Sequence, residues 1–367
     1  MPFPPCHVNN VSVAGVSGGL LAARVCKAGG LGMIAAGHFQ DLSKLEKEIQ
    51  IFKEDMNDVP GYHDKDDGKS STEGSMSMSQ PHQSDLSIGF IGFSTLSTPN
   101  GWTEYEYILK HYRPKAVQFF APSILFHPND GLSNVKLAHE NNTQFIAQVG
   151  SMSEAKEAIR HKVNAIICQG SEAGGHGLRR ELGSSTMALA SQVSKMTNIP
   201  VLAAGGIVNG KHLASALCVC DGASMGTRFW ATKESIGNPK LQQELIKDNS
   251  CDDVVRTTVF DQVQNELSSI KWPHPYHSVG ALCNQTSSEW DGKTSQELQN
   301  AIDKTELLEE YKSAQKASDP QVVCILSGEG VGEIDHIEGA YDVTMRIEEE
   351  AIDSINRLQS ISISICN

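Results

Sequence analysis

Short apolar runs alternate with amphipathic stretches along most of the chain, and this alternation predicts its fold. Eight of the runs lack strict apolar–polar alternation, which is typical of parallel strands that are buried on both faces. These candidate strands lie at 10–14, 31–35, 86–92, 115–120, 143–149, 164–168, 199–204 and 221–225.

Between most of these runs, apolar residues recur with helical spacing. The helical stretches lie at 17–28, 40–56, 102–111, 130–141, 152–162, 183–196 and 209–219. Eight strand–helix units over roughly 225 residues fit an α/β fold of the closed (β/α)8 type, a TIM barrel, better than an open doubly wound sheet.

Two segments interrupt the rhythm of strands and helices. Residues 58–84 are rich in Ser, Gly, Asp and His and contain few large apolar residues, so we predict a mobile surface insertion there. Residues 232–319 look helical without the strand–helix repeat, and they predict a smaller, mainly helical inserted domain. The barrel would then comprise 1–231 and 320–367, the latter including a last amphipathic helix at 338–357.

Composition and charge narrow the functional classes. The 367-residue chain has a net charge of −14 and no basic stripe, which argues against nucleic acid or an anionic membrane as a partner. No apolar run approaches the roughly 20 residues of a membrane span, and the N-terminus lacks the pattern of a signal peptide. Nine scattered cysteines without a CxxC pair predict reduced thiols, with neither disulfides nor a metal site. We therefore expect a soluble, cytoplasmic protein.

Two strand-to-helix corners carry dense glycine. They are "AAGGIVNGKHL" (203–213), with Gly205 and Gly206, and "GASMGTRFWATKES" (222–235), with Gly226 and Thr227. Small residues let backbone N–H groups approach an anion closely, and TIM barrels often bind phosphate in the loops after strands 7 and 8. These corners predict a phosphate-bearing cofactor, and the alternative is a pair of ordinary tight turns. Neither a Rossmann nor a Walker A motif is present, and "GEGVG" (328–332) follows a predicted late strand, which does not fit a nucleotide-binding turn.

The stretch "CQGSEAGGHG" (168–177) follows the sixth predicted strand. Gln169 would then point into the barrel mouth, where catalytic residues of this architecture lie. Gly174 and Gly175 remove side-chain bulk, so that a planar cofactor could lie beside His176. A neutral imidazole suits a general base, and the alternative is a turn histidine that only bonds its own loop.

Taken together, these segments resemble the nitronate monooxygenase family, formerly called 2-nitropropane dioxygenases. The resemblance spans nearly the whole chain outside 58–84. It is carried by 14–38 ("AGVSGGLLAARVCKAGGLGMIAAGH"), 168–177, 200–210 ("PVLAAGGIVNG") and 222–235, and more weakly by 278–286 and 327–334.

The resemblance implies a TIM barrel that binds FMN non-covalently, with His176 as the catalytic residue. His176 would act as a base toward neutral nitroalkanes and would position nitronates. The first strand departs from the family pattern, and only its Ala14-Gly15 end fits a flavin contact. The other implied cofactor-binding residues are Gln169 and Gly174 near the flavin, and Gly205, Gly206, Ser224, Met225, Gly226 and Thr227 around its phosphate.

The reaction implied by the resemblance is the oxidation of an alkyl nitronate, such as propionate 3-nitronate, by O2. The products are a carbonyl compound and nitrite, and NAD(P)H is not required. The partners are then a small nitronate and O2, and the sequence leaves open whether the chain forms a homo-oligomer.

Two other functions stay open at this point. An FMN-dependent NAD(P)H reductase, of the enoyl-ACP or quinone reductase type, shares the fold and the "EAGGH" loop. A catalytically silent flavin-binding protein would be consistent with the atypical first strand.

Overall fold

The computed structural model describes most of the chain. Ala14, Gly15 and almost all of the predicted insertion at 58–84 lie outside the described residues. The described ranges are 8–10, 16–36, 42–58, 85–91, 101–120, 133–178, 181–268, 271–304 and 306–365.

Eight parallel strands form one sheet in the order β1-β9-β8-β6-β5-β4-β3-β2. At the two ends of this order, the N–H of Ala35 on β2 donates to the carbonyl of Ser17, shortly after β1, at 3.0 Å. The predicted TIM barrel is therefore confirmed. The strands are β1 (Val8–Asn10), β2 (Ile34–Ala35), β3 (Ser87–Ile91), β4 (Ala116–Phe120), β5 (Gln144–Val149), β6 (Ala165–Gln169), β8 (Val201–Ala204) and β9 (Gly222–Met225).

Helices follow the strands where the sequence predicts them. Local signals fix several of their starts; for example, Ser151 and Glu154 form a reciprocal capping box at the start of α5. The barrel helices are α1 (Gly19–Lys27), α2 (Leu42–Asn57), α3 (Gly101–Tyr112), α4 (Asn134–Glu140), α5 (Met152–Arg160), α6 (Thr186–Ser194), α7 (Gly210–Leu217), the short α8 (Thr227–Trp230) and the C-terminal α14 (Ala340–Ile365).

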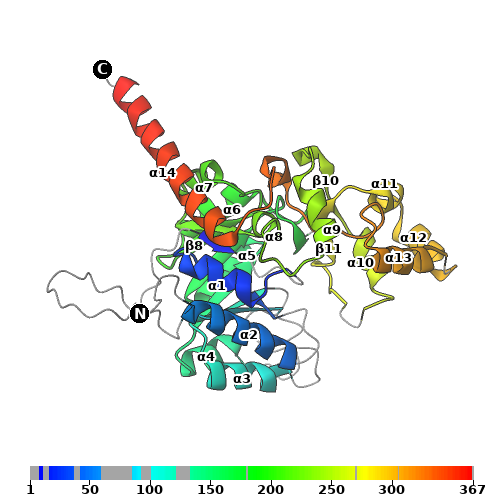
Figure 1. The fold of residues 1–367 in the computed structure, drawn as a ribbon, viewed down its shortest axis with the longest axis horizontal. Helices are drawn as coiled ribbons and strands as arrows, with labels where there is room; N and C mark the ends of the chain where they lie inside the picture. The colour runs from blue at the N-terminus through cyan, green and yellow to red at the C-terminus, as the bar shows by residue number, and fades with distance from the viewer. Residues whose placement is uncertain are drawn as a thin grey trace, which may run out of the picture.

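The last helix, α14, begins against the barrel and ends away from it. Its first half packs on α7 and α1, and its C-terminal half extends from the body (Figure 1). It has 26 residues, yet among the described residues no helix is long and apolar enough to cross a membrane.

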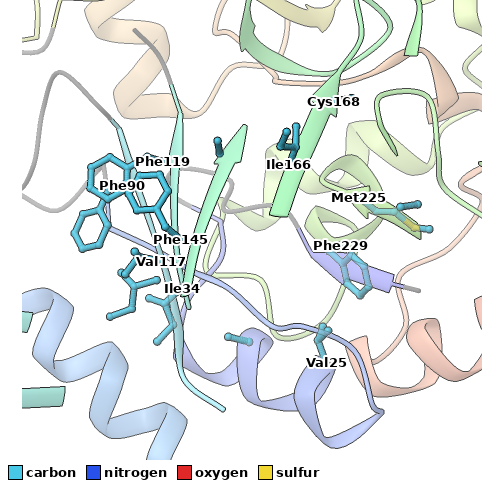
Figure 2. Close-up of a cluster of buried hydrophobic side chains, with 14 of the residues drawn as sticks. Val25, Ile34, Phe90, Val117, Phe119, Phe145, Ile166, Cys168, Met225 and Phe229 are labelled. Atoms are coloured by element: carbon cyan, nitrogen blue, oxygen red, sulfur yellow. The ribbon is translucent and has the colours of Figure 1, made fainter. Parts of the chain in front are cut away.

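The main hydrophobic core lies between the strands and the helices that surround them (Figure 2). Phe119 on β4 is fully buried, and its ring centroid lies 5.1 Å from those of Phe90, Phe145 and Tyr105. A second cluster fills the barrel interior and comprises Leu31, Met33, Ala116, Ile146, Ala165, Ile167, Leu202 and Ala204. The alternation of side chains along each strand produces these two layers.

Residues 232–319 form a region beside the barrel with a hydrophobic cluster of its own (Figure 1). It is not purely helical, because β10 and β11 join β7, from the barrel's "AGGHG" segment, in an antiparallel sheet. The domain boundaries stay a prediction. The elements are β7 (Gly175–Gly177), α9 (Pro239–Gln242), η1 (Gln243–Ile246), η2 (Cys251–Asp253), β10 (Val254–Thr257), α10 (Val259–Gln264), β11 (Ser278–Leu282), α11 (Gln285–Trp290), α12 (Ser295–Asp303) and α13 (Glu306–Ala317).

The late strand predicted before "GEGVG" was wrong. Residues 322–328 make only one isolated bridge, between Leu326 and Ala281, and the short helix η3 (Glu329–Glu333) follows. The apolar side chains of this run are divided between two hydrophobic clusters. Their burial therefore produces the apolar pattern without a strand.

Substitution of Phe119 by alanine tests the aromatic packing of the core. We expect Phe119→Ala to lower the free energy of unfolding by about 3–5 kcal/mol, because it removes three ring contacts and leaves a cavity. Urea unfolding followed by circular dichroism measures the change. The control Leu358→Ala, whose side chain is 50% exposed on α14, should stay within about 0.5 kcal/mol of the parent. Equal losses in the two variants would contradict this account of the core.

Candidate functional site

A cavity with about 1070 Å³ of empty space opens at the carboxyl ends of the barrel strands. Strands β3, β4, β5, β6, β8 and β9 each contribute lining residues, as do β7 and the "GEGVG" segment. The cavity thus lies at the end of the barrel where this architecture holds its active sites.

Most of the predicted site residues line this one cavity. They are Gln169, Gly174, His176, Gly205, Gly206, Ser224, Gly226 and Thr227. Met225 differs, because its side chain packs in the hydrophobic core together with Phe229 (Figure 2). Only the backbone of Met225 is therefore available to a cofactor. Ala14 and Gly15 lie outside the described residues.

The first glycine corner needs glycine for its backbone. Gly205 has φ +126° and Gly206 has φ +70°, both in the region that side chains disfavour. A Cβ on Gly205 would lie 2.6 Å from Oγ1 of Thr186, and one on Gly330 would lie 2.6 Å from the carbonyl oxygen of Gly206. The corner is therefore packed closely on both sides, and its backbone faces the cavity.

The second corner presents hydroxyl groups to the same cavity. Oγ1 of Thr227 accepts a hydrogen bond from the N–H of Gly328 at 3.0 Å, which leaves its own O–H able to donate. Oγ of Ser224 is buried and has no hydrogen-bond partner among the described residues. Two hydroxyl donors beside the glycine backbone that lines the cavity suit an anionic group such as a phosphate.

His176 lies on β7, and its imidazole contacts a carboxylate and an aromatic ring. Its Nε2 lies 2.8 Å from Oδ1 of Asp261 on α10. Its ring stacks on that of Trp272, with centroids 3.7 Å apart and planes 9° apart. A carboxylate can only accept a hydrogen bond, so the proton of a neutral His176 belongs on Nε2 and the lone pair on Nδ1. The imidazole side chain is 17% exposed and lines the cavity.

Arg256 on β10 holds the loop that leads to His176. Its guanidinium donates to the carbonyls of Ser171 at 3.2 Å, Gly175 at 3.4 Å and Ser278 at 3.3 Å, and also to that of Ala173. One charged group thereby satisfies carbonyls from the loop and from β11. The region at 232–319 thus helps to fix the loop, together with bonds on the barrel side such as that from the N–H of Ser171 to the carbonyl of Ser184 at 2.9 Å.

Gly174 lines the cavity and also packs closely against the backbone of Ser327 and Gly328. A Cβ there would lie 2.6 Å from the carbonyl carbon of Ser327 and 2.7 Å from the nitrogen of Gly328. The expectation that glycine at this position only makes room for a cofactor is therefore incomplete.

Three glutamines line the cavity side by side on adjacent strands: Gln118 on β4, Gln148 on β5 and Gln169 on β6. Only Gln169 was singled out from the sequence. The signal that could have found the other two is a single amide within each of the apolar runs "AVQFF" and "FIAQV". All three side chains are buried.

Cys168, the cysteine next to Gln169 in the sequence, is not activated for nucleophilic chemistry. Cys168 precedes Gln169, but its side chain faces the helices and belongs to the hydrophobic core. Burial raises the pKa of this thiol well above its usual value. Cys168 therefore stays protonated, and the imidazole of His176 is the titratable group that faces the cavity from the "CQGSEAGGHG" segment.

Sequence reasoning missed the residues that surround His176 from the region at 232–319. Arg256, Asp261 and Trp272 belong to no local motif, and they lie 80 or more residues from His176 along the chain. It also discounted the "GEGVG" run, whose Gly328 and Gly330 line the cavity.

A family model and the curated relatives in sequence point to one family. The family model described as nitronate monooxygenase matches residues 109–347. The nitronate monooxygenase npaC of Metarhizium robertsii is 36% identical over 211 residues, which cover 55% of this chain and 56% of that protein. The match therefore spans about half the length of that relative. The nitronate monooxygenase of Neurospora crassa is 24% identical over 374 aligned positions, covering 95% of this chain and 89% of that protein.

Two solved structures share the fold. FabK from Thermotoga maritima superposes with a TM-score of 0.70 at 23% identity, over 97% of this chain and 96% of that one. Nitroalkane oxidase from Streptomyces ansochromogenes gives a TM-score of 0.70 at 21% identity, over 96% of this chain and 98% of that one. At these identities the likeness supports the barrel architecture alone.

Replacement of Arg256 tests how the His176 loop is held. We expect Arg256→Met to speed amide hydrogen exchange in residues 171–178 by at least tenfold, because several carbonyls lose a charged donor worth about 1.5–3 kcal/mol each. Exchange measured by mass spectrometry resolves this segment. Arg160→Met, which removes a surface ion pair on α5, should leave the segment unchanged. Unaltered protection in Arg256→Met would show that the loop is stable without these bonds.

Proposed function

Because the chain belongs to the nitronate monooxygenase family, which is flavin-dependent, we propose that it binds FMN in the barrel-mouth cavity and oxidises alkyl nitronates with O2. The products would be a carbonyl compound and nitrite. One observation carries the proposal: an imidazole with a defined tautomer and two glycine corners with hydroxyl donors line the same cavity.

The residues present fit FMN. Ser224 has a buried hydroxyl that lacks a partner among the described residues, and Thr227 keeps a free O–H. Together with the backbone at Gly205, Gly206 and Gly226, they would hold the phosphate. Gln169 and Gly174 would lie along the flavin. When bound, FMN supplies the two-electron acceptor for the substrate and the site of reaction with O2.

His176 would handle the proton. With Nε2–H committed to Asp261, the lone pair of Nδ1 can accept the α-proton of a neutral nitroalkane. The carboxylate of Asp261 then stabilises the imidazolium that forms, as in other histidine–carboxylate pairs. A nitronate has already lost that proton, so toward a nitronate His176 would only position the anion.

We place the reaction in the cytoplasm, with a small nitronate and O2 as partners. Seven of the nine cysteines lie in the described part of the chain, and none of these seven forms a disulfide there, which is usual for a reducing compartment. Propionate 3-nitronate is the substrate we would test first.

The purified protein tests the proposal directly. We expect a flavin absorbance spectrum, FMN released on denaturation, and nitrite formed from propionate 3-nitronate in air without NADH. An NAD(P)H-dependent reductase would instead bleach rapidly with NADH under anaerobic conditions and form no nitrite. A colourless protein that cannot be loaded with FMN would refute both enzymes.

The catalytic pair gives the first prediction from this function. His176→Asn should keep FMN but lower nitrite formation from a neutral nitroalkane about 100-fold or more, since a positioned general base contributes that much. The loss with a preformed nitronate should be smaller, because no proton has to be removed. His139→Asn, an exposed histidine on α4, is the matched control and should keep full activity.

The effect of Asp261→Asn on activity should depend on the presence of His176. Asp261→Asn removes the carboxylate that fixes the tautomer, so we expect an intermediate loss with nitroalkanes. If the two residues act as a unit, the double variant should be no slower than His176→Asn alone. Multiplied losses would argue that Asp261 acts elsewhere.

The phosphate corner gives a second prediction. Gly206→Val should lower FMN occupancy at least tenfold, because valine disfavours φ +70° and its side chain would distort the anion-binding backbone. The matched control is Gly29→Val, which has φ +91° with open space around its Cβ and lies far from the cavity. Both variants should lose similar stability, about 1–2 kcal/mol. Flavin released on denaturation measures occupancy, and full occupancy in Gly206→Val would place the phosphate elsewhere.

A further inference from the structure

The three glutamines at the barrel mouth form a continuous row of hydrogen bonds. Nε2 of Gln118 donates to Oε1 of Gln148 at 2.5 Å, and Nε2 of Gln148 donates to Oε1 of Gln169 at 3.0 Å. Nε2 of Gln169 donates to the backbone carbonyl of His176 at 2.8 Å. The three side chains are between 2% and 7% exposed. An amide turned the wrong way would therefore lose its hydrogen bond without gaining one to bulk water.

One backbone atom sets the direction of the whole row. A carbonyl oxygen cannot donate, so Gln169 must turn its NH2 toward His176 and its oxygen toward Gln148. Gln148 must then offer its NH2 to that oxygen, and its own oxygen faces Gln118. Gln118 donates to that oxygen from its NH2. The order of donors and acceptors therefore follows from hydrogen-bond chemistry alone.

The row ends on an acceptor without a donor. Oε1 of Gln118 is buried and has no hydrogen-bond partner among the described residues, and Gln118 lines the cavity. A buried polar atom left unpaired costs about 1–3 kcal/mol. The amide cannot flip to relieve this cost without facing its NH2 away from Gln148 and breaking the row. Because Gln118 lines the cavity, a molecule that fills the cavity can supply the missing donor.

We infer that Oε1 of Gln118 accepts the N3–H of the flavin ring, an inference that rests on the proposed function. Oxidised flavin carries one ring N–H, at N3, whereas N5 bears hydrogen only after reduction. Oε1 of Gln118 needs a donor while the flavin is oxidised, and among the ring atoms only N3–H meets that condition.

The barrel topology supports the same pairing. In the eight-strand order, β4 lies four places from β9 and three from β8, so Gln118 and the phosphate corners stand on opposite walls of the barrel. A cofactor with a phosphate at one end and a ring donor at the other matches this separation. A short substrate anion would reach either Gln118 or the phosphate corners, but not both.

The experiment is a binding cycle that needs no turnover. Flavin-free protein, with the parent sequence or with Gln118→Met, is titrated with FMN or with N3-methyl-FMN, and quenching of flavin fluorescence gives each Kd. Methionine has a similar size and no acceptor oxygen. In the parent, we expect N3-methylation to raise Kd about tenfold, the upper end of the loss of one hydrogen bond. In Gln118→Met, the two flavins should bind within about twofold of each other.

The cycle separates this pairing from general damage. Gln118→Met also leaves Gln148 without a donor, but that cost is common to both flavins and cancels in their ratio. Gln118→Glu retains a carboxylate acceptor and should keep the penalty for methylation. Gln192→Ala, at an exposed glutamine on α6, should behave as the parent does.

The outcomes distinguish this inference from the proposed function. An equal methylation penalty in the parent and in Gln118→Met overturns the pairing, while tight FMN binding by the parent leaves the flavoprotein proposal intact. No penalty in the parent also overturns the pairing. Failure of the parent to bind FMN removes the proposed function and this inference with it.

Discussion

The alternation of side chains along parallel strands is the constraint on which the site depends. On β6, Ile166 and Cys168 pack outward against the helices, whereas Ala165, Ile167 and Gln169 face the barrel interior. A shift of one residue would exchange the two sets and bury the amide among the helices. Strands β4 and β5 obey the same rule, so three interior amides bond to one another above an apolar layer. That layer supports the cavity floor, and the amides give the cavity its polarity.

The barrel alone does not complete the site. His176 lies on β7, which pairs only with β11 of the neighbouring region within the described sheet, and its Nε2 bonds Asp261 on α10. Arg256 ties the loop before it to β10. The catalytic candidate is thus carried by the barrel's chain, and its imidazole is positioned from outside the barrel. Docking of the region at 232–319 is therefore a condition for a defined imidazole rather than only for substrate access.

The sequence predicted what local patterns can encode. Apolar runs located the strands, and glycine corners after them located a cavity wall, because backbone conformations such as those of Gly205 and Gly206 require glycine. Met225 shows the limit of a motif: it lies between two lining residues, yet alternation sends its side chain into the core. Asp261 and Trp272 could not be predicted, because contact between segments more than 80 residues apart produces no local motif in the sequence. The run at 322–328 misled for another reason, since its apolar side chains are buried without pairing as a strand.

Hydrogen bonds of defined direction connect the barrel, His176 and the neighbouring region. His176 is held twice: its carbonyl accepts from Gln169, and its imidazole N–H donates to Asp261. The first bond belongs to a row that starts at the far wall of the cavity, and the second belongs to the neighbouring region. A ligand that satisfies the open oxygen of Gln118 would therefore bind to the same row that holds the backbone of the histidine strand. Flavin position and imidazole position would then be set relative to each other by buried amides of defined direction, which is what proton transfer at a fixed distance requires.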